Sequence, residues 1–143
     1  MMRIIKISTD LEMQVFEYPE GDLSAQMQAL QDLVGNGCNY VERVRPRRLY
    51  TMLGVPRVVT TNPGECATMI VDEDGLLRNL PVNAVGSWLY ETDRHGSPIV
   101  GNIVIVGEIY VGTGIKFCGI SDDLFERLYP KLQQIIEKVR EMA

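Results

Sequence analysis

Four arginines close together form the strongest group of chemically active side chains in the sequence. They are Arg43, Arg45, Arg47 and Arg48. On a strand, alternation would place Arg43, Arg45 and Arg47 on one face, where guanidinium groups can hold phosphates through paired hydrogen bonds. The competing interpretation is an edge strand that its charges and Pro46 protect against aggregation. The group therefore predicts either a nucleic-acid binding surface or a solvated strand.

A second candidate site lies at a turn that contains two asparagines. Asn79 and Asn83 flank a proline, and a proline at a helix start stands beside backbone amides that can hold an anion. Arg78 adjoins this turn, and we expect Arg45 or Arg47 to approach from a neighbouring strand. The asparagine amides can pair with the edges of a nucleotide base. These five residues form the predicted ligand-binding site; the alternative is that Asn83 only caps a helix.

Groups needed for catalysis show no matching spacing. The only histidine, His95, lies in a polar turn, and nothing in the sequence ties it to a serine or cysteine nucleophile. The three cysteines, Cys38, Cys66 and Cys118, are far apart, so we expect neither a zinc site nor a disulfide framework. The acidic run at 72–74 lacks the calcium-loop pattern and is typical of a turn. We expect a protein that is not an enzyme and that holds no cofactor and no metal.

Strands and helices must position these residues, and the spacing of apolar residues predicts them. Strands or extended segments are predicted at residues 3–8, 12–18, 39–52, 67–71 and 99–111. The last of these is apolar on both faces, which is typical of a central strand covered from both sides. An acidic turn at 72–75 indicates a hairpin into Leu76 and Leu77. The glycines at 112–114 indicate a loop after the central strand.

Helices are predicted on either side of these strands. Apolar residues at helical spacing indicate helices at 23–34 and 122–141, and Pro130 should kink or split the second. A short helix should begin near Pro81. The predicted fold class is α+β, with a mostly antiparallel sheet, a packed N-terminal helix and a C-terminal helix.

Length, composition and charge limit the class of protein. The chain has 143 residues, of which 45% are hydrophobic and 23% charged, as expected for one globular domain spanning 1–143. The net charge of −5 favours solubility and opposes non-specific binding to nucleic acid or anionic membrane. No apolar run is long enough to span a bilayer, and the opening apolar stretch is too short for a signal peptide. We expect a cytoplasmic protein.

The stretch from Val71 to Asn83 carries a pattern of an acidic turn with glycine, a short strand and Leu-Pro-x-Asn. An Ile-x-Gly-apolar segment follows at Ile99–Gly107, and Ser121 with two aspartates precedes the closing helix. This arrangement resembles the domain-of-unknown-function family numbered 3846, whose members are typical of bacteriophages, plasmids and other mobile elements. The resemblance covers residues 67–129 best, and residues 39–66 are longer than the family pattern leads us to expect. It implies an accessory gene whose product acts in the cytosol of a bacterial host, and it carries over no catalytic residues.

These observations support two functions from different classes. The first is a non-enzymatic accessory protein of a phage or mobile element that binds and sequesters a host molecule, either a nucleotide signal of a defence system or a host protein. The alternative is a nucleic-acid binding module that uses the four arginines, although the net charge opposes strong binding. We also expect a homo-oligomer, most simply a dimer, because residues 99–111, the C-terminal helix and Trp88 offer much apolar surface.

Overall fold

The computed structural model describes residues 2–142, and these residues form six strands and five helices. The strands are β1 (Arg3–Ile7), β2 (Met13–Glu17), β3 (Val41–Val44), β4 (Cys66–Asp72), β5 (Ile103–Val111) and β6 (Gly114–Cys118). The helices are α1 (Leu23–Val34), α2 (Arg47–Thr51), α3 (Ala84–Leu89), α4 (Thr92–His95) and α5 (Asp122–Met142). The order along the chain is β1-β2-α1-β3-α2-β4-α3-α4-β5-β6-α5.

The six strands form one antiparallel sheet with β5 at its centre. The order is β2-β1-β5-β4-β3, and β6 also pairs with β5. β4 pairs along one edge of β5. On the other edge, β1 pairs with residues 103–105 and β6 with residues 107–111. The predicted central strand and the predicted α+β fold class are therefore confirmed.

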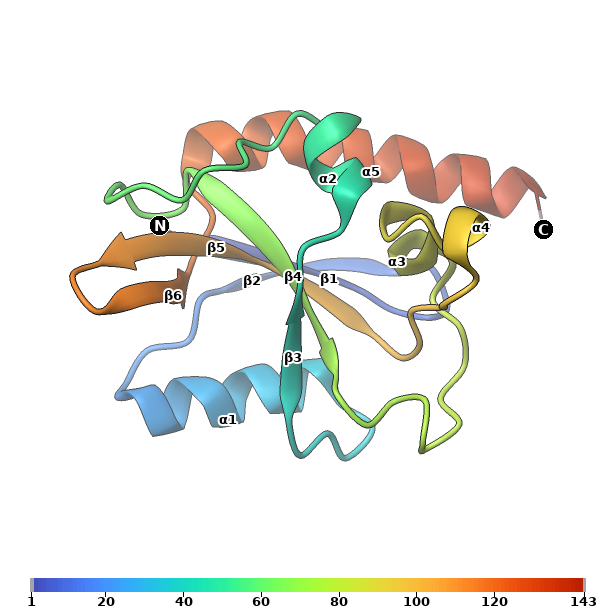
Figure 1. The fold of residues 1–143 in the computed structure, drawn as a ribbon, viewed down its shortest axis with the longest axis horizontal. Helices are drawn as coiled ribbons and strands as arrows, with labels where there is room; N and C mark the ends of the chain where they lie inside the picture. Colours follow the sequence, from blue (N-terminus) through green and yellow to red (C-terminus); the bar gives the residue numbers. More distant parts are fainter. Residues whose placement is uncertain (1, 143) are drawn as a thin grey trace.

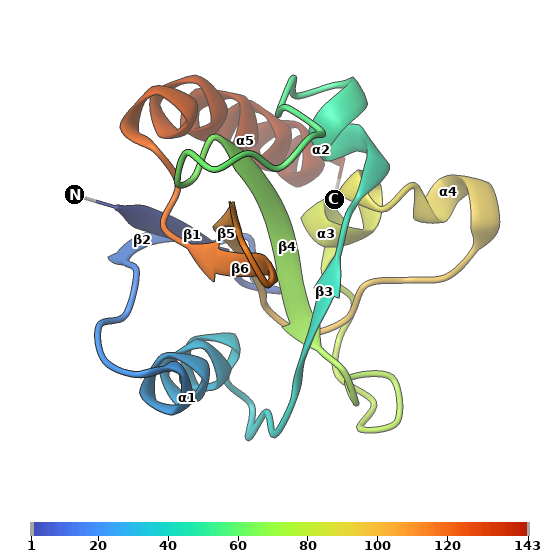
Figure 2. The ribbon, with the colours of Figure 1, turned by 60° about the vertical axis from the view of Figure 1, so that its left-hand side comes forward.

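Helices cover both faces of the sheet (Figures 1 and 2), with α5, α2 and α3 on one side and α1 on the other. Ile103 and Ile105 of β5 belong to the core cluster that includes Leu128 of α5. The intervening Val104 belongs to a second cluster, with Leu30 of α1. Because successive residues of a strand point to opposite faces, a strand covered on both sides needs apolar residues at almost every position. This explains the continuous apolar run in β5.

The two long helices lie where the sequence predicts them. α1 begins after Asp22, whose side chain accepts a hydrogen bond from Ala25 N at 2.8 Å. α5 runs from Asp122 to Met142 as one helix, so Pro130 does not split it, which was one of the two predicted effects. Pro130 and Glu126 are exposed, so the carbonyl that loses its N–H partner can bond to water. Among residues 2–142, no helix is both long and apolar enough to cross a membrane.

Two local predictions are wrong. The extended segment at 39–52 contains only the short strand β3, and Pro46 precedes helix α2, because its extended backbone suits a helix start. The predicted hairpin partner at Leu76 and Leu77 is a turn, and these two side chains are exposed. The loop predicted after the central strand is confirmed as a turn at 112–113, and it leads into strand β6, which was not predicted and which makes a hairpin with β5.

Three glycines bring four chain segments together beside the central strand. A Cβ on Gly107 of β5 would lie 2.7 Å from the carbonyl carbon of Gly119 and 3.0 Å from Cα of Gly64. Gly64 N donates to the backbone oxygen of Glu108 at 3.1 Å. Ile120 N donates to the Arg3 oxygen at 2.8 Å, which attaches the segment after β6 to β1. This close backbone approach requires glycine, because a side chain has no space there.

Candidate functional site

The four arginines do not share one face. β3 ends at Val44, and Arg47 and Arg48 belong to helix α2. The prediction that Arg47 lies on a strand face with Arg43 and Arg45 is therefore wrong. Arg43 lies opposite Ile70, and Ile70 belongs to the core cluster on the α1 side of the sheet.

Arg43 and Arg45 flank a buried carboxylate, Glu108 of β5. Arg43 Nη2 lies 2.8 Å from Oε2 of Glu108, and Arg45 Nη1 donates to Oε1 at 3.1 Å. The Glu108 side chain is fully buried, whereas each arginine side chain is about one-third exposed. Oε2 accepts no directed hydrogen bond despite its proximity to Arg43. Two guanidinium groups and one carboxylate leave a net charge of +1 at this position.

Arg45 is also held by its other neighbours. Its Nη2 donates to the Arg57 carbonyl at 2.6 Å, and its guanidinium lies 4.9 Å from the centre of the Tyr50 ring. Burial raises the pKa of Tyr50 to about 12. Burial, and then Glu108, raise the pKa of the Cys66 thiol, whose sulfur lies 3.6 Å from Oε1. Cys66 therefore stays protonated at neutral pH, which disfavours a role as a nucleophile.

The arginines of α2 are paired with carboxylates as well. Arg48 donates to both carboxylate oxygens of Asp93, at 2.7 and 2.9 Å, and its guanidinium lies 5.0 Å from the centre of the Trp88 ring. Arg47 lies 3.7 Å from Glu91. Arg48 lowers the pKa of Asp93, chiefly through its hydrogen bonds. Each of the four arginines thus faces a carboxylate, and Arg43 and Arg45 share one.

The predicted turn site is divided between the interior and the surface. Asn83 is fully buried, and its Nδ2 donates to the carbonyls of Ile7 and Gly101, each at 3.0 Å. Its Oδ1 accepts from Gly86 N at 2.9 Å, which makes it the N-cap of α3. The side chain has no surface with which to contact a ligand. Asn83 therefore has the capping role that was the alternative interpretation, and its buried position gives no support to the predicted contact with a ligand.

The other members of that predicted site lie apart. Arg78 is bound to Asp72 at 2.5 Å and also donates to the Asn36 carbonyl. Asn79 is exposed, with a positive φ of 55°. Asp72 and Arg78 lie where β3 starts and β4 ends, since Val41 pairs with Asp72. Arg45 and Arg47 follow the opposite end of β3, so the structure does not bring the five predicted residues together.

We expect Asn83→Ala to lower the free energy of unfolding by about 2–3 kcal/mol, because it removes a helix cap and two buried hydrogen bonds to carbonyls. Asp22→Ala, at the exposed cap of α1, should cost only about 1 kcal/mol. Urea denaturation followed by circular dichroism measures both. Equal losses would show that the two buried hydrogen bonds of Asn83 contribute nothing.

His95 and the cysteines show no catalytic pairing among residues 2–142. His95 is exposed, and its ring contacts the Tyr90 carbonyl at 2.7 Å and Ser97 N at 3.2 Å, both backbone atoms. Burial raises the pKa of Cys118 to about 11. The described residues also contain no group of three or more His, Cys, Asp or Glu side chains arranged for a metal ion.

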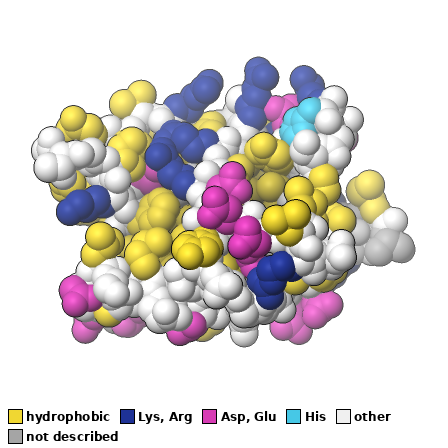
Figure 3. Space-filling view, turned by 60° about the horizontal axis from the view of Figure 1, so that its bottom comes forward, with side chains coloured by type: hydrophobic (Ala, Val, Ile, Leu, Met, Phe, Trp, Pro, Cys, Tyr) yellow, Lys and Arg dark blue, Asp and Glu magenta, His cyan; other side chains and the backbone are white. Residues whose placement is uncertain are grey.

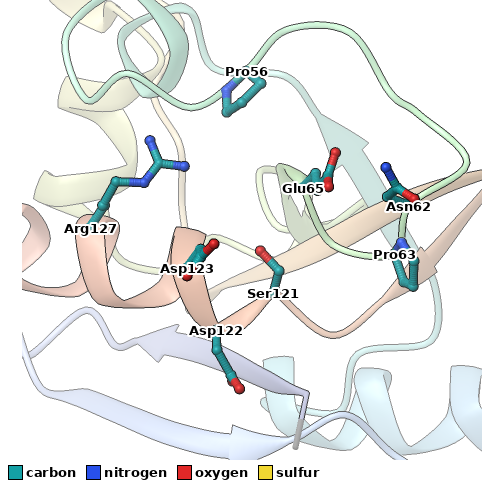
Figure 4. Close-up of a pocket in the computed structure, with 8 residues that line it drawn as sticks. All are labelled: Pro56, Asn62, Pro63, Glu65, Ser121, Asp122, Asp123 and Arg127. Atoms are coloured by element: carbon teal, nitrogen blue, oxygen red, sulfur yellow. The ribbon is translucent and has the colours of Figure 1, made fainter.

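A polar depression lies at the start of α5 (Figure 4), with a volume of about 640 Å³. Glu65, Asp122, Asp123 and Arg127 line it, together with Ser121. Figure 4 shows Asp122 pointing away from the other two carboxylates. The negative charges oppose an anion, and the carboxylates do not converge on a cation. This depression therefore lacks the arrangement of a ligand site.

A smaller pocket between α1, β3 and β6 has a more suitable lining, and we call it the α1–β6 pocket. Its volume is about 290 Å³. Aromatic and aliphatic side chains form its walls, and two basic side chains and one amide supply polar groups: Tyr18, Leu23, Gln26, Met27, Arg43, Ile115, Lys116 and Phe117. Figure 3 shows hydrophobic side chains exposed next to basic ones on the face that carries α1.

Sequence reasoning missed this pocket except for Arg43. Strand β6 contains Ile115, Lys116 and Phe117. It was not predicted, because the glycines on either side of Thr113 indicated only a loop. Alternation in β6 was the available signal: Phe117 lies opposite Glu108 and packs against the α1-side core, whereas Lys116 lies opposite Ile109 and is exposed. Burial raises the pKa of Tyr18 to about 12, so its hydroxyl is a neutral hydrogen-bond donor at physiological pH.

Comparisons with known proteins give one match. The family model described as a domain of unknown function, DUF3846, matches residues 39–134. The matched range includes residues 39–66, so β3, α2 and the arginines are part of the domain that this family shares. No curated protein matches the chain. No solved structure matches it either.

Proposed function

The chain belongs to the DUF3846 family, and because that description assigns no activity, we propose a function from the α1–β6 pocket. The protein is a non-enzymatic accessory protein that binds and sequesters a small anionic, aromatic molecule of the host, such as a nucleotide. The observation that carries this proposal is the combination of aromatic walls and basic side chains in one pocket. Its origin in a phage or other mobile element is also part of the proposal, and the sequence resemblance supports it.

The walls of the pocket suit a flat ring. Tyr18 and Phe117 are half-buried, and each packs against the core that α1 covers. Stacking of a nucleobase on an aromatic side chain contributes about 1–3 kcal/mol. Gln26 offers an amide that can donate to and accept from the edge of a base. The volume lies at the lower end of the range typical of small-molecule sites, which favours a ligand no larger than a mononucleotide.

The charges of the pocket suit an anion. Lys116 is exposed and takes part in no ion pair among the described residues. The ion pair with buried Glu108 holds the Arg43 guanidinium in place. Because Arg43 and Arg45 share this one carboxylate, the three side chains together keep a net positive charge. A guanidinium held in one orientation loses less entropy when it binds an anion. No carboxylate lines the pocket itself.

The proposal is tested first by mass spectrometry of small molecules released when freshly purified protein is denatured. Calorimetric titration with AMP and with cyclic mononucleotides as probes then measures affinity. Lys116→Ala and Phe117→Ala should each weaken binding about tenfold, equivalent to about 1.4 kcal/mol. Lys138→Ala, on an exposed position of α5, should leave affinity unchanged. The proposal fails if no small molecule is released and no probe binds, or if the three variants bind alike.

A further inference from the structure

The face opposite α1 carries a groove between α2, α3 and the C-terminal half of α5, which we call the α2–α5 groove. Its volume is about 450 Å³. Its apolar lining consists of Met52, Leu53, Trp88, Ile135, Val139 and Met142. Met52 is 62% exposed and Met142 is 86% exposed. Methionine adapts to irregular partners, and exposed apolar side chains gathered in a groove are typical of protein interaction sites.

The length of the groove suits a helix. Along α5, the lining positions 131, 135, 138 and 142 recur every three or four residues, so they follow one side of the helix for three turns. At about 1.5 Å per residue, this line is about 16 Å long. A helical segment of similar length presents its own apolar stripe at the same spacing. The indole of Trp88 offers a large, rigid contact of the kind that dominates binding energy at interfaces.

The charge of the groove is opposite to that of the whole chain. Lys131 and Lys138 line it, and no carboxylate of residues 2–142 does, although the net charge of the chain is −5. Lys131 Nζ donates to the Leu53 carbonyl at 2.9 Å, which fixes the wall between α2 and α5. Lys138 makes no ion pair with the described residues. A basic rim around an apolar floor complements a partner with acidic side chains beside apolar ones.

We propose that the α2–α5 groove binds an acidic amphipathic helix of another protein. The helices α2 and α5 that line this groove lie on the opposite face of the sheet from α1, which lines the α1–β6 pocket (Figures 1 and 2), so the two sites share no residue. The protein would then bring a protein partner and a small molecule to opposite faces of one sheet.

A second copy of this chain is the competing occupant of the groove. The expectation of a dimer rested on the apolar surface of residues 99–111, the C-terminal helix and Trp88. The structure places Ile103–Val106 and the stripe of α5 formed by Leu124, Leu128, Leu132 and Ile136 inside the core. Only the groove remains as a large apolar surface among these features. Two copies would also bring their lysines together there, which opposes self-association.

The test uses the whole protein and two fluorescein-labelled helical peptides. Both carry leucine at positions i, i+4, i+7 and i+11; one has glutamate on its polar face and the other has lysine. Fluorescence anisotropy should show binding of the acidic peptide with a dissociation constant in the micromolar range, and binding of the basic peptide at least about tenfold weaker. Equal binding of the two peptides, or no binding of either, would overturn the proposal.

Two variants place the peptide in the groove. Met52→Glu and Lys138→Glu should each weaken binding of the acidic peptide at least about tenfold. Leu77→Glu is the matched control, because Leu77 is equally apolar and 86% exposed but lies in the turn after β4. Unchanged binding by both groove variants contradicts the proposal. A dimer that occupies the groove also contradicts it. In that case light scattering shows that the unmodified protein is a dimer that does not bind the peptide, and that Met52→Glu is a monomer. Thermal denaturation confirms that each variant is folded.

Discussion

Gly107→Ala should lower the free energy of unfolding by about 3 kcal/mol, at the upper end of the usual cost of overpacking. The added methyl group would lie 2.7 Å from the Gly119 carbonyl carbon and 3.0 Å from Gly64 Cα. These atoms belong to backbone, so no side chain can turn away to make room. The methyl group can be accommodated only if β5, the loop before β4 and the segment after β6 move apart. For a chain of this length, the melting temperature should fall by about 10 °C.

Gly112→Ala is the control for this prediction. A Cβ at Gly112, in the turn between β5 and β6, meets no atom within 4 Å. Its φ also lies outside the left-handed region, so the change should alter stability by less than about 1 kcal/mol, and a small gain is the favoured direction. Chemical denaturation of both variants under one set of conditions compares them. A Gly107→Ala protein as stable as the Gly112→Ala protein would show that the three segments separate at little cost.

Glu108→Gln should lower the free energy of unfolding by about 2–3 kcal/mol. The substitution keeps the size of the side chain but removes the negative charge that faces both Arg43 and Arg45. Breaking a buried ion pair on one side typically costs about 3–5 kcal/mol. The arginine side chains are about one-third exposed, so water can stabilise part of the uncompensated charge and the expected loss is smaller.

The matched control is Asp122→Asn, which removes the carboxylate that lies 3.3 Å from Arg3. The Asp122 side chain is 62% exposed, and surface ion pairs contribute about 0–1 kcal/mol. Equilibrium unfolding in urea should therefore separate the two variants clearly. If Glu108→Gln costs no more than Asp122→Asn, Glu108 does not hold β3 against β5 electrostatically, and Arg43 is not fixed in the way that the α1–β6 pocket requires.

The elements that the sequence predicts best are those whose pattern depends on local chemistry. α1 has both the right apolar spacing and a capping aspartate, and β5 has an apolar run that only a covered strand needs. The structure of the segment after β3 was harder to predict, because Pro46 is compatible both with an edge strand and with a helix start. β6 has short apolar stretches between glycines, and its partner β5 decides its structure rather than its own propensity.

The candidate site was less predictable because it depends on contacts between distant residues. Asn83 could be identified as a cap from its position before a helix, but its bonds to Ile7 and Gly101 could not. Arg43 and Arg45 stood out by charge, whereas their partner Glu108 lies 63 residues beyond Arg45. One signal was available. A single carboxylate inside the apolar run of β5 must find a cation when it is buried, and the arginines at 43–48 are the densest group of cations in the sequence.

The pairing of β1 with β5 has a consequence for how the chain folds during synthesis. Ile5 lies opposite Ile105 in the sheet, so the first strand must wait for about 100 residues to be made before it finds its permanent neighbour. At about 5–20 residues per second, that delay is about 5–20 s. Until then β1 has only β2, and a lone hairpin is marginally stable in water. Until β5 is made, the apolar edge of β1 that will pair with it therefore stays unpaired and open to other chains.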